Sequence, residues 1–191
     1  MNRRTLGIAA GALALATVAF VSIGARPDAG RASHDARVAR GEYLVRIMGC
    51  NDCHTPLKMG ERGPEPDMAR MLSGHPENFP VGAAPALPGT WLMTTAVTGT
   101  AFAGPWGISF TANLTPDQNT GLGIWTEEMF VNAIRTGKHM GVSRPINPPM
   151  PWQTYRFATD EDLKSLYAYL RTIPPVVNHV PDYQPPAVTT H

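Results

Sequence analysis

Two cysteines, spaced three positions apart and followed directly by a histidine, constrain this chain more than any other feature of its sequence. Cys50 and Cys53 are the only cysteines among the 191 residues, and His54 completes the run Cys-Asn-Asp-Cys-His. A zinc site would need a second pair of ligands at comparable spacing, whereas the other histidines occur singly along the chain. A thioredoxin-like redox pair would need a preceding strand within a βαβ frame, and here the pattern before Cys50 is helical.

The same run is typical of covalent attachment of haem c. Each thiol can form a thioether bond with one vinyl group of the porphyrin, and the two intervening residues let both sulfurs reach one edge of the macrocycle. The imidazole of His54 can then bind the iron as a neutral ligand. We predict one covalent haem c held by Cys50 and Cys53, with His54 as an axial ligand. Zinc, redox and plain disulfide sites stay open as weaker alternatives.

The first 25 residues form a separate segment with the pattern of a targeting signal. Arg3 and Arg4 precede an uncharged apolar stretch over residues 6–23, and small residues follow it. This stretch is near the lower length limit for spanning a bilayer, so a cleaved signal peptide and a retained anchor are both open. Either way, the positive-inside rule sends the remainder across the membrane. We expect a periplasmic protein, soluble after cleavage or anchored to the inner membrane through residues 6–23.

The composition limits the class of the remaining domain. The formal net charge is +1, which lacks the strong basic excess of nucleic-acid-binding proteins. The 18 glycines and 19 prolines break up regular structure, so we expect a few short helices joined by long loops. No Lys or Arg occurs between Met71 and Ile134, and this stretch is either a solvated face or a docking surface.

Three helices are predicted from apolar periodicity and capping residues. We expect them over residues 33–48 and 126–136, and from residue 159 to the prolines at 174 and 175. Ser33, Thr126 and Thr159 can cap the free amides of the first turns. Gly41, on the apolar stripe of the first helix, either admits a neighbouring helix or is merely a tolerated weak position.

Residues 55–112 show no clear helix or long strand. Two short strands, over residues 90–97 and 107–111, are the most that their pattern supports. An irregular stretch of this length is unusual in a small domain, but a haem would supply a large apolar body for the loops to surround.

A low-spin haem that carries electrons needs a second axial ligand, usually Met or His. Met150 is the strongest candidate of the nine methionines, because flanking prolines are expected to stiffen Pro-Pro-Met-Pro into an extended run. Trp152 beside it offers apolar surface that could close the cofactor site. Met140, Met93 and His139 are the alternatives.

Several motifs together make the chain resemble a cytochrome c domain, in particular the haem modules of cytochrome subunits that serve bacterial dehydrogenases such as alcohol dehydrogenase. The resemblance covers residues 33–181. Its motifs are Cys50–His54 after a helix, Asn113–Asp117, Thr120–Trp125, Arg135–His139, and Pro148–Trp152 before a final helix. Asn113, Thr115 and Trp125 could lie near the haem, although loop packing is the plainer interpretation.

The resemblance implies a mostly α cytochrome c fold, with three main helices around a covalently bound haem and long Gly/Pro-rich loops. Residue by residue, it implies that Cys50 and Cys53 anchor the haem and that His54 and Met150 bind its iron. Related subunits often carry several haems, whereas this chain has one attachment motif. Around the domain we expect a linker over residues 26–32 and a flexible C-terminal tail over residues 182–191.

The implied function is electron transfer in the periplasm, without an enzymatic activity of the chain's own. A dehydrogenase would donate the electrons, and a terminal oxidase or another cytochrome would accept them for the respiratory chain. The alternative is a haem enzyme or sensor with an open, peroxidase-like distal site. For that chemistry, His139 is the one acid–base group near Met150 in the sequence.

Overall fold

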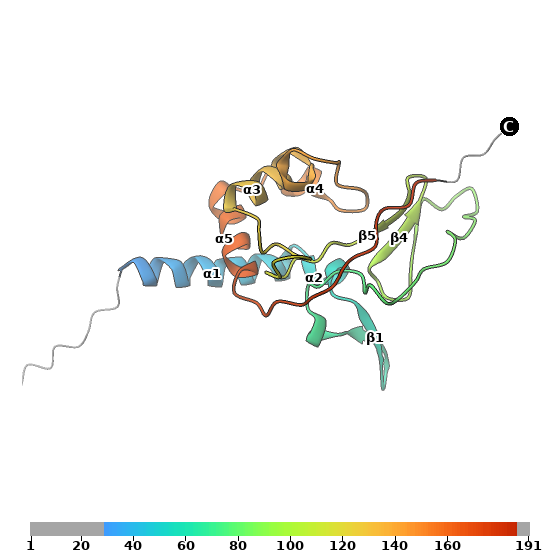
Figure 1. Cartoon of the computed structure of the whole chain (residues 1–191), viewed down its shortest axis with the longest axis horizontal. Coiled ribbons are helices and arrows are strands. Elements are labelled where there is room, and N and C mark those ends of the chain that lie inside the picture. Colours follow the sequence, from blue (N-terminus) through green and yellow to red (C-terminus); the bar gives the residue numbers. More distant parts are fainter. Residues whose placement is uncertain (1–28, 187–191) are drawn as a thin grey trace, which may run out of the picture.

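Two helices from opposite ends of the domain's sequence pack against each other (Figure 1). In this computed structural model, which describes residues 29–186, these helices are α1 (Ala29–Ile47) and α5 (Asp160–Leu170). The predicted signal or anchor lies outside the described residues. Within the described range, no helix is both long and apolar enough to cross a membrane.

Gly41 lets α1 and α5 come unusually close. A Cβ atom at this position would lie 1.9 Å from the carbonyl oxygen of Ser165 and 2.7 Å from the Cβ atom of Tyr169. Of the two interpretations of Gly41, the close approach of a neighbouring helix is therefore the correct one. Around the crossing lies an apolar core with residues from both helices, among them Leu44, Val45, Leu163, Leu166 and Leu170.

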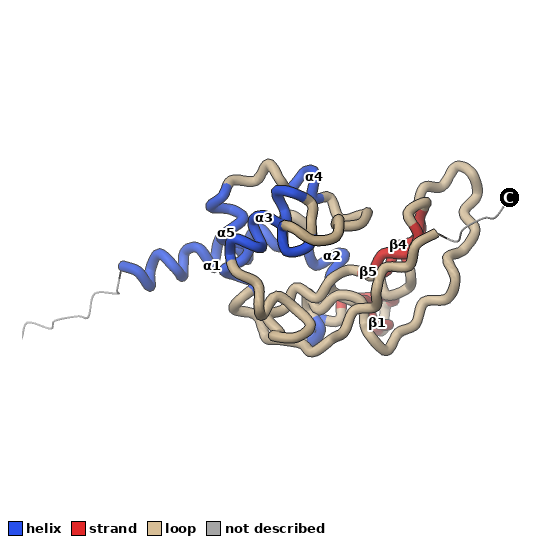
Figure 2. Tube along the Cα trace, turned by 45° about the horizontal axis from the view of Figure 1, so that its top comes forward, coloured by secondary structure: helices blue, strands red, loops and turns tan. Residues whose placement is uncertain are grey.

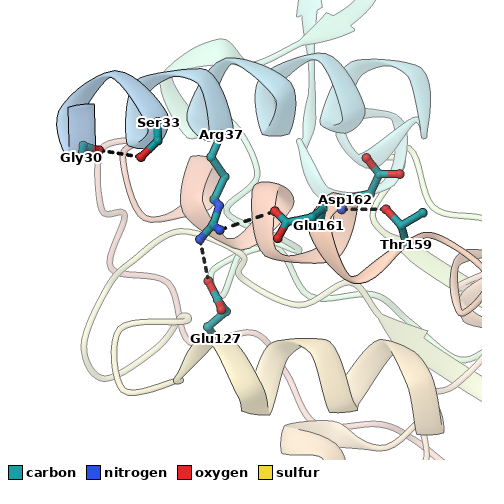
Figure 3. A network of polar contacts seen from close by, with 7 residues as sticks. All are labelled: Gly30, Ser33, Arg37, Glu127, Thr159, Glu161 and Asp162. Carbon is teal, nitrogen blue, oxygen red and sulfur yellow. Dashed lines mark hydrogen bonds and ion pairs between the residues drawn. The ribbon is translucent and has the colours of Figure 1, made fainter. Parts of the chain in front are cut away.

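The first helix begins earlier than its sequence pattern predicts. Ser33 lies inside α1, where its hydroxyl donates a hydrogen bond of 2.8 Å to the carbonyl of Gly30, so its assignment as the cap is wrong (Figure 3). The helix continues back to Ala29, into the expected linker, because no proline interrupts it after residue 27. A nearby hydroxyl-bearing residue is thus not sufficient to mark a helix start.

Capping by Thr126 and Thr159 is confirmed. In α3 (Glu127–Thr136) the Thr126 hydroxyl accepts a hydrogen bond of 3.1 Å from the amide of Met129. In α5 the Thr159 hydroxyl accepts one of 3.1 Å from the amide of Asp162, drawn in Figure 3. Arg37 of α1 joins these two helices, since its guanidinium lies 3.6 Å from Glu127 and 3.4 Å from Glu161.

The region between α1 and α3 contains more strand than expected, as Figure 2 shows. Strands β1 (Leu57–Gly60) and β2 (Gly63–Pro66) form an antiparallel hairpin that the sequence pattern did not predict. Strands β3 (Thr94–Thr95) and β5 (Gly107–Phe110) fall within the two expected stretches but do not pair with each other. Instead β4 (Ala101–Gly104) lies between them in an antiparallel sheet of order β3-β4-β5. Strand β4 is rich in alanine and glycine, and the hairpin contains glycine, proline, lysine and glutamate. These residues have low strand propensity, which explains why β4 and the hairpin were missed.

Four shorter elements complete the described structure. Two are short α-helices and two are single turns of 3₁₀ helix: α2 (Cys50–His54), α4 (Trp152–Tyr155), η1 (Met68–Arg70) and η2 (His139–Gly141).

The end of the described chain is held against the sheet. Ile108 and Gln184 exchange backbone hydrogen bonds of 2.8 and 3.0 Å, and the Tyr183 hydroxyl donates to the carbonyl of Trp106. Gln184, which the sequence analysis assigned to the tail, therefore forms a bridge with β5. The part of that tail after residue 186 lies outside the described residues.

A buried asparagine ties this C-terminal segment to the loop after α2. The side-chain oxygen of Asn178 accepts hydrogen bonds from Arg70 and from the amide of Glu77, both 2.9 Å long. Its side-chain nitrogen donates to the carbonyls of Ser73 and His75 at 2.7 and 2.8 Å. Asn178 thus fixes the loop after α2 to the C-terminal segment of the domain.

Candidate cofactor site

A cavity of about 390 Å³ lies between the helices and the three-stranded sheet. Its volume falls within the range of about 300–1,000 Å³ that is usual for small-molecule and cofactor sites. All four predicted site residues contribute to its wall, namely Cys50, Cys53, His54 and Met150. The fold therefore brings together two segments that lie about a hundred residues apart in the sequence.

The short helix α2 explains how the cysteines and the histidine reach the same wall. Residues three and four positions apart share one face of a helix, so Cys50, Cys53 and His54 point to the same side. Gly49, which separates α2 from α1, has a φ of 69°, a left-handed conformation that glycine adopts without strain. The glycine thus permits the change of direction that aims α2 at the cavity.

His54 is buried, with 8% of its surface exposed, and its ring is held by the backbone. Its Nδ1 atom lies 2.8 Å from the carbonyl oxygen of Ala112. A carbonyl only accepts hydrogen bonds, so Nδ1 carries the proton and Nε2 keeps its lone pair for a metal. Burial lowers the pKa of His54, and the hydrogen bond to Ala112 opposes this only in part. The imidazole is therefore neutral at pH 7, as an iron ligand requires.

The environment of the cysteines argues against a thioredoxin-like redox pair. Burial raises the pKa of Cys50 from 9.0 to about 11, with the carboxylate of Asp52 adding to the shift. Burial also raises the pKa of Cys53. Redox-active pairs of this spacing instead lower the pKa of one thiol. Both thiols are free, so the plain disulfide is not formed.

The zinc alternative lacks a ligand set. Among residues 29–186, no group of three or more His, Cys, Asp or Glu side chains lies in an arrangement that could hold a metal ion. A structural zinc site requires four such ligands, so these residues do not support it.

Met150 is half-buried and packs against the apolar core at the cavity wall. Its segment does not run extended as predicted, because Pro148 and Pro149 form a turn. The turn is held by a hydrogen bond of 2.5 Å from the Ser109 hydroxyl of β5 to the carbonyl of Pro148. Of the alternatives, Met93 and Met140 lie outside the cavity lining, whereas His139 contributes to it.

Trp152 does not close the cavity. Its indole ring covers Gly137 at the end of α3, where a Cβ atom would lie 2.3 Å from the ring. Trp125 lines the cavity instead, and its ring meets that of His139 edge to face at 5.0 Å between centroids. The expectation for Trp152 is therefore wrong, whereas Trp125 does border the cavity, as the resemblance allowed.

Asn113 and Thr115 have structural partners. The side-chain oxygen of Asn113 accepts hydrogen bonds from both the amide and the hydroxyl of Thr115. Its nitrogen donates to the carbonyl of Val176 at 2.8 Å. Asn113 borders the cavity, but its polar atoms are used in holding the loop, so the loop-packing interpretation is the better one for both residues.

The residues that line the cavity fit the haem that the attachment motif implies. Two thiols share one helix face, a neutral imidazole has its tautomer fixed, and a thioether is available from a separate loop. Much of the wall is apolar, with Phe130 of α3 and leucines of α5. Arg144 and Tyr155 also line the cavity, and neither was singled out from the sequence, since no local motif distinguishes them.

Comparisons with known proteins show which proteins this chain is similar to. No family model matches the chain. The gluconate 2-dehydrogenase cytochrome c subunit of Pantoea cypripedii is 30% identical over 158 residues, which are 83% of this chain and 27% of that protein. The fructose dehydrogenase cytochrome subunit of Gluconobacter japonicus is 30% identical over 140 residues, or 73% of this chain and 22% of that protein.

A third relative matches nearly the whole chain. The alcohol dehydrogenase (quinone) cytochrome c subunit of Komagataeibacter europaeus is 27% identical over 186 residues, covering 97% of this chain and 31% of that protein. The chain thus spans roughly a quarter of the length of the relatives it matches. All three relatives are named as cytochrome subunits, in agreement with the prediction of an electron carrier rather than an enzyme. The chain is therefore similar to the cytochrome c subunits of bacterial dehydrogenases, as its motifs predicted.

Proposed function

We propose that this chain is a periplasmic electron carrier with one covalent haem c. It would accept electrons from a dehydrogenase and pass them toward the respiratory chain. The observation that carries the proposal is that Cys50, Cys53, His54 and Met150 all line one cavity. Since the chain has only two cysteines, it can attach one haem by thioether bonds.

Each of the four residues has a defined task in this proposal. Cys50 and Cys53 would hold the haem to α2, and His54 and Met150 would bind its iron. When bound, the haem would supply one-electron chemistry at its iron. The Ala112 carbonyl keeps the His54 ring in one tautomer and orientation and raises its basicity as a ligand. The leucines of α5 exclude water from the wall beside the cofactor.

The partners and the location are part of the same proposal. The names of the relatives support a dehydrogenase as electron donor. A terminal oxidase or another cytochrome would be the acceptor. The arginines and apolar stretch of residues 1–25 support export, with membrane association through residues 6–23 where that segment is retained.

The experiment that tests the proposal combines haem linkage with iron ligation. The exported protein should give the pyridine haemochrome spectrum of a haem with two thioether bonds, one haem per chain, and should keep its haem on a denaturing gel. Cys50→Ala with Cys53→Ala should lose this covalent haem. A colourless protein, or haem that is extracted by acidic acetone, would refute the proposal.

Ligation by Met150 is tested separately. Met150→Ala should abolish the charge-transfer band of thioether-ligated ferric haem and allow the reduced protein to bind carbon monoxide. Met93→Ala is the matched control, because Met93 lies outside the cavity lining. Carbon monoxide binding by the unaltered reduced protein would instead favour the open, peroxidase-like site. Peroxide turnover that His139→Ala abolishes would identify His139 as its acid–base group.

A further inference from the structure

A long stretch between α2 and α3 carries no charged side chain. Residues 78–116 contain no Asp, Glu, Lys or Arg, in a chain where these residues make up 16% of the total. Part of this stretch is buried in β4 and β5, where the absence of charge is expected. The remainder is at the surface, and that part requires an explanation.

The surface part is a loop that exposes large apolar side chains. Residues 82–86 and 88–93 are all exposed, and Trp91 and Leu92 have 69% and 68% of their surface in solvent. Val97, just beyond β3, is 79% exposed. In Figure 1 the loop projects beside β4 and β5, at the end of the molecule away from the start of α1. Contiguous apolar exposure of this kind is unusual unless another surface covers it.

The loop is held in place at both ends. The carbonyl of Phe79 accepts a hydrogen bond of 2.9 Å from the buried His75 ring, and Thr94–Thr95 pairs with β4. Prolines at positions 80, 85 and 88 restrict the backbone between these points. A surface that is already ordered loses little entropy when a partner binds.

A recess lies beside the loop. Phe79, Val97 and Met59 of the hairpin β1–β2 help to line a hollow of about 320 Å³. Its lining also includes Arg70 and the ion pair of Lys58 with Asp67, whose charged atoms lie 3.7 Å apart. Met59 is itself 77% exposed. A side chain of a partner could therefore insert between the loop and the hairpin.

The charges around the loop decide what kind of partner fits. Membrane-surface segments combine aromatic residues with Lys or Arg, which attract anionic lipid headgroups. Here no Lys or Arg occurs between Met71 and Ile134, and the charged residues of that stretch are acidic. Short-lived encounters between redox proteins are steered by complementary charge, which residues 78–116 do not provide. An uncharged apolar surface instead suits a long-lived contact between subunits, because a partner's charge would be desolvated here without compensation.

We propose that Phe79, Trp91, Leu92, Met93 and Val97, termed the apolar loop surface, dock permanently against an uncharged, apolar patch on the catalytic subunit of a dehydrogenase. The inference rests on the proposed function, since it assigns a surface to the electron donor. The loop leads directly into β3, which pairs with β4, and Phe102 of β4 lines the cofactor cavity. The partner would therefore lie on the sheet side of that cavity.

Site-specific crosslinking in the native host tests this assignment. The affinity-tagged full chain carries photoreactive benzoylphenylalanine in place of Leu92 or, as control, in place of Phe157, which is 82% exposed on the helical side. After illumination of membranes, the chain is purified and crosslinked peptides are identified by mass spectrometry. We expect the Leu92 position to crosslink to a dehydrogenase catalytic subunit and the Phe157 position not to do so.

Other results would overturn the inference. They are a phospholipid adduct, a crosslink to a second copy of the chain, equal crosslinking from both positions, or no crosslink at position 92. The haem spectrum of the same preparation tests the proposed function independently. If the covalent haem is absent, the proposed function fails; if the haem is present and reducible but the crosslink is absent, only the docking inference fails.

Binding measurements with the crosslinked subunit give a second readout. Trp91→Ser combined with Leu92→Ser should weaken the affinity of the haem-loaded chain for that subunit by about thirtyfold or more, as expected for loss of an aromatic anchor. Phe157→Ser is the matched control and should leave the affinity unchanged. Both variants should retain the absorption spectrum of the unaltered protein. Unchanged affinity in the double variant would contradict the inference.

Discussion

Replacement of Gly41 by alanine should destabilise the protein, although alanine is the better helix former. On an exposed helical surface, glycine to alanine gains about 1 kcal/mol. At this crossing the new Cβ atom would lie 1.9 Å from the Ser165 carbonyl oxygen and 2.6 Å from its carbonyl carbon. Both atoms belong to the backbone of α5, so no side-chain rotation can relieve the overlap. The helices would have to separate by roughly 1 Å or more to restore normal contact.

The expected magnitude follows from two opposing contributions. Overpacking of a well-packed core costs about 1–3 kcal/mol, and an immovable backbone neighbour places Gly41 at the upper end of that range. Subtracting the gain in helix propensity leaves a destabilisation of about 2 kcal/mol. The separation would also loosen Val45, which is 1% exposed beside the crossing.

Urea unfolding of the haem-loaded protein, followed by far-ultraviolet circular dichroism, measures this change. Gly82→Ala is the control, because a Cβ atom there would meet nothing within 4 Å. Its free energy of unfolding should stay within about 0.5 kcal/mol of the unaltered protein. Unchanged or increased stability of Gly41→Ala would refute the close crossing of α1 and α5.

Three further predictions concern stability. Asn178→Ala should lower the free energy of unfolding by about 3 kcal/mol, because it leaves the buried carbonyls of Ser73 and His75 unpaired; urea unfolding checks this. Thr159→Ala should cost about 1 kcal/mol by the same assay, since the first turn of α5 loses its cap. Burial lowers the pKa of His75 below its ordinary value of 6.5, so the folded state binds that proton less readily than the unfolded state. Stability should therefore fall as the pH drops below about 6.5, and a flatter pH profile in His75→Gln, measured by thermal unfolding, would confirm the cause.

Most of the correct sequence predictions rest on patterns among residues that are close in the sequence. The spacing of Cys50, Cys53 and His54 is a property of one helical turn, and the structure places all three at the cavity. The hydroxyls of Thr126 and Thr159 accept hydrogen bonds from amides three residues ahead, so their capping can also be predicted from neighbouring residues. Met150 was selected because its segment is chemically unusual, and the structure places it in the cavity wall. The turn at Pro148 and Pro149 was missed, since proline restricts φ without specifying the fold of a whole segment.

Long-range contacts explain what the sequence did not reveal. The Ala112 carbonyl that holds His54 lies 58 residues away and has no distinguishing side chain. Strand β4 consists mainly of residues with low strand propensity and exists because β3 and β5 flank it and the core covers it. Ser33 failed as a predicted cap because the residues before it continue the helix.

The acceptor for His54 is a main-chain atom, and this has a consequence for mutational robustness. No single substitution at position 112 can delete a carbonyl oxygen, whereas an aspartate or glutamate in the same role would be lost by one base change. Only a shift in the path of the loop itself could weaken the hold on the imidazole. In the proposed cytochrome, the electron-donating character of His54 would thus depend on the path of the backbone. Substitutions of the side chain at position 112 would leave it unchanged.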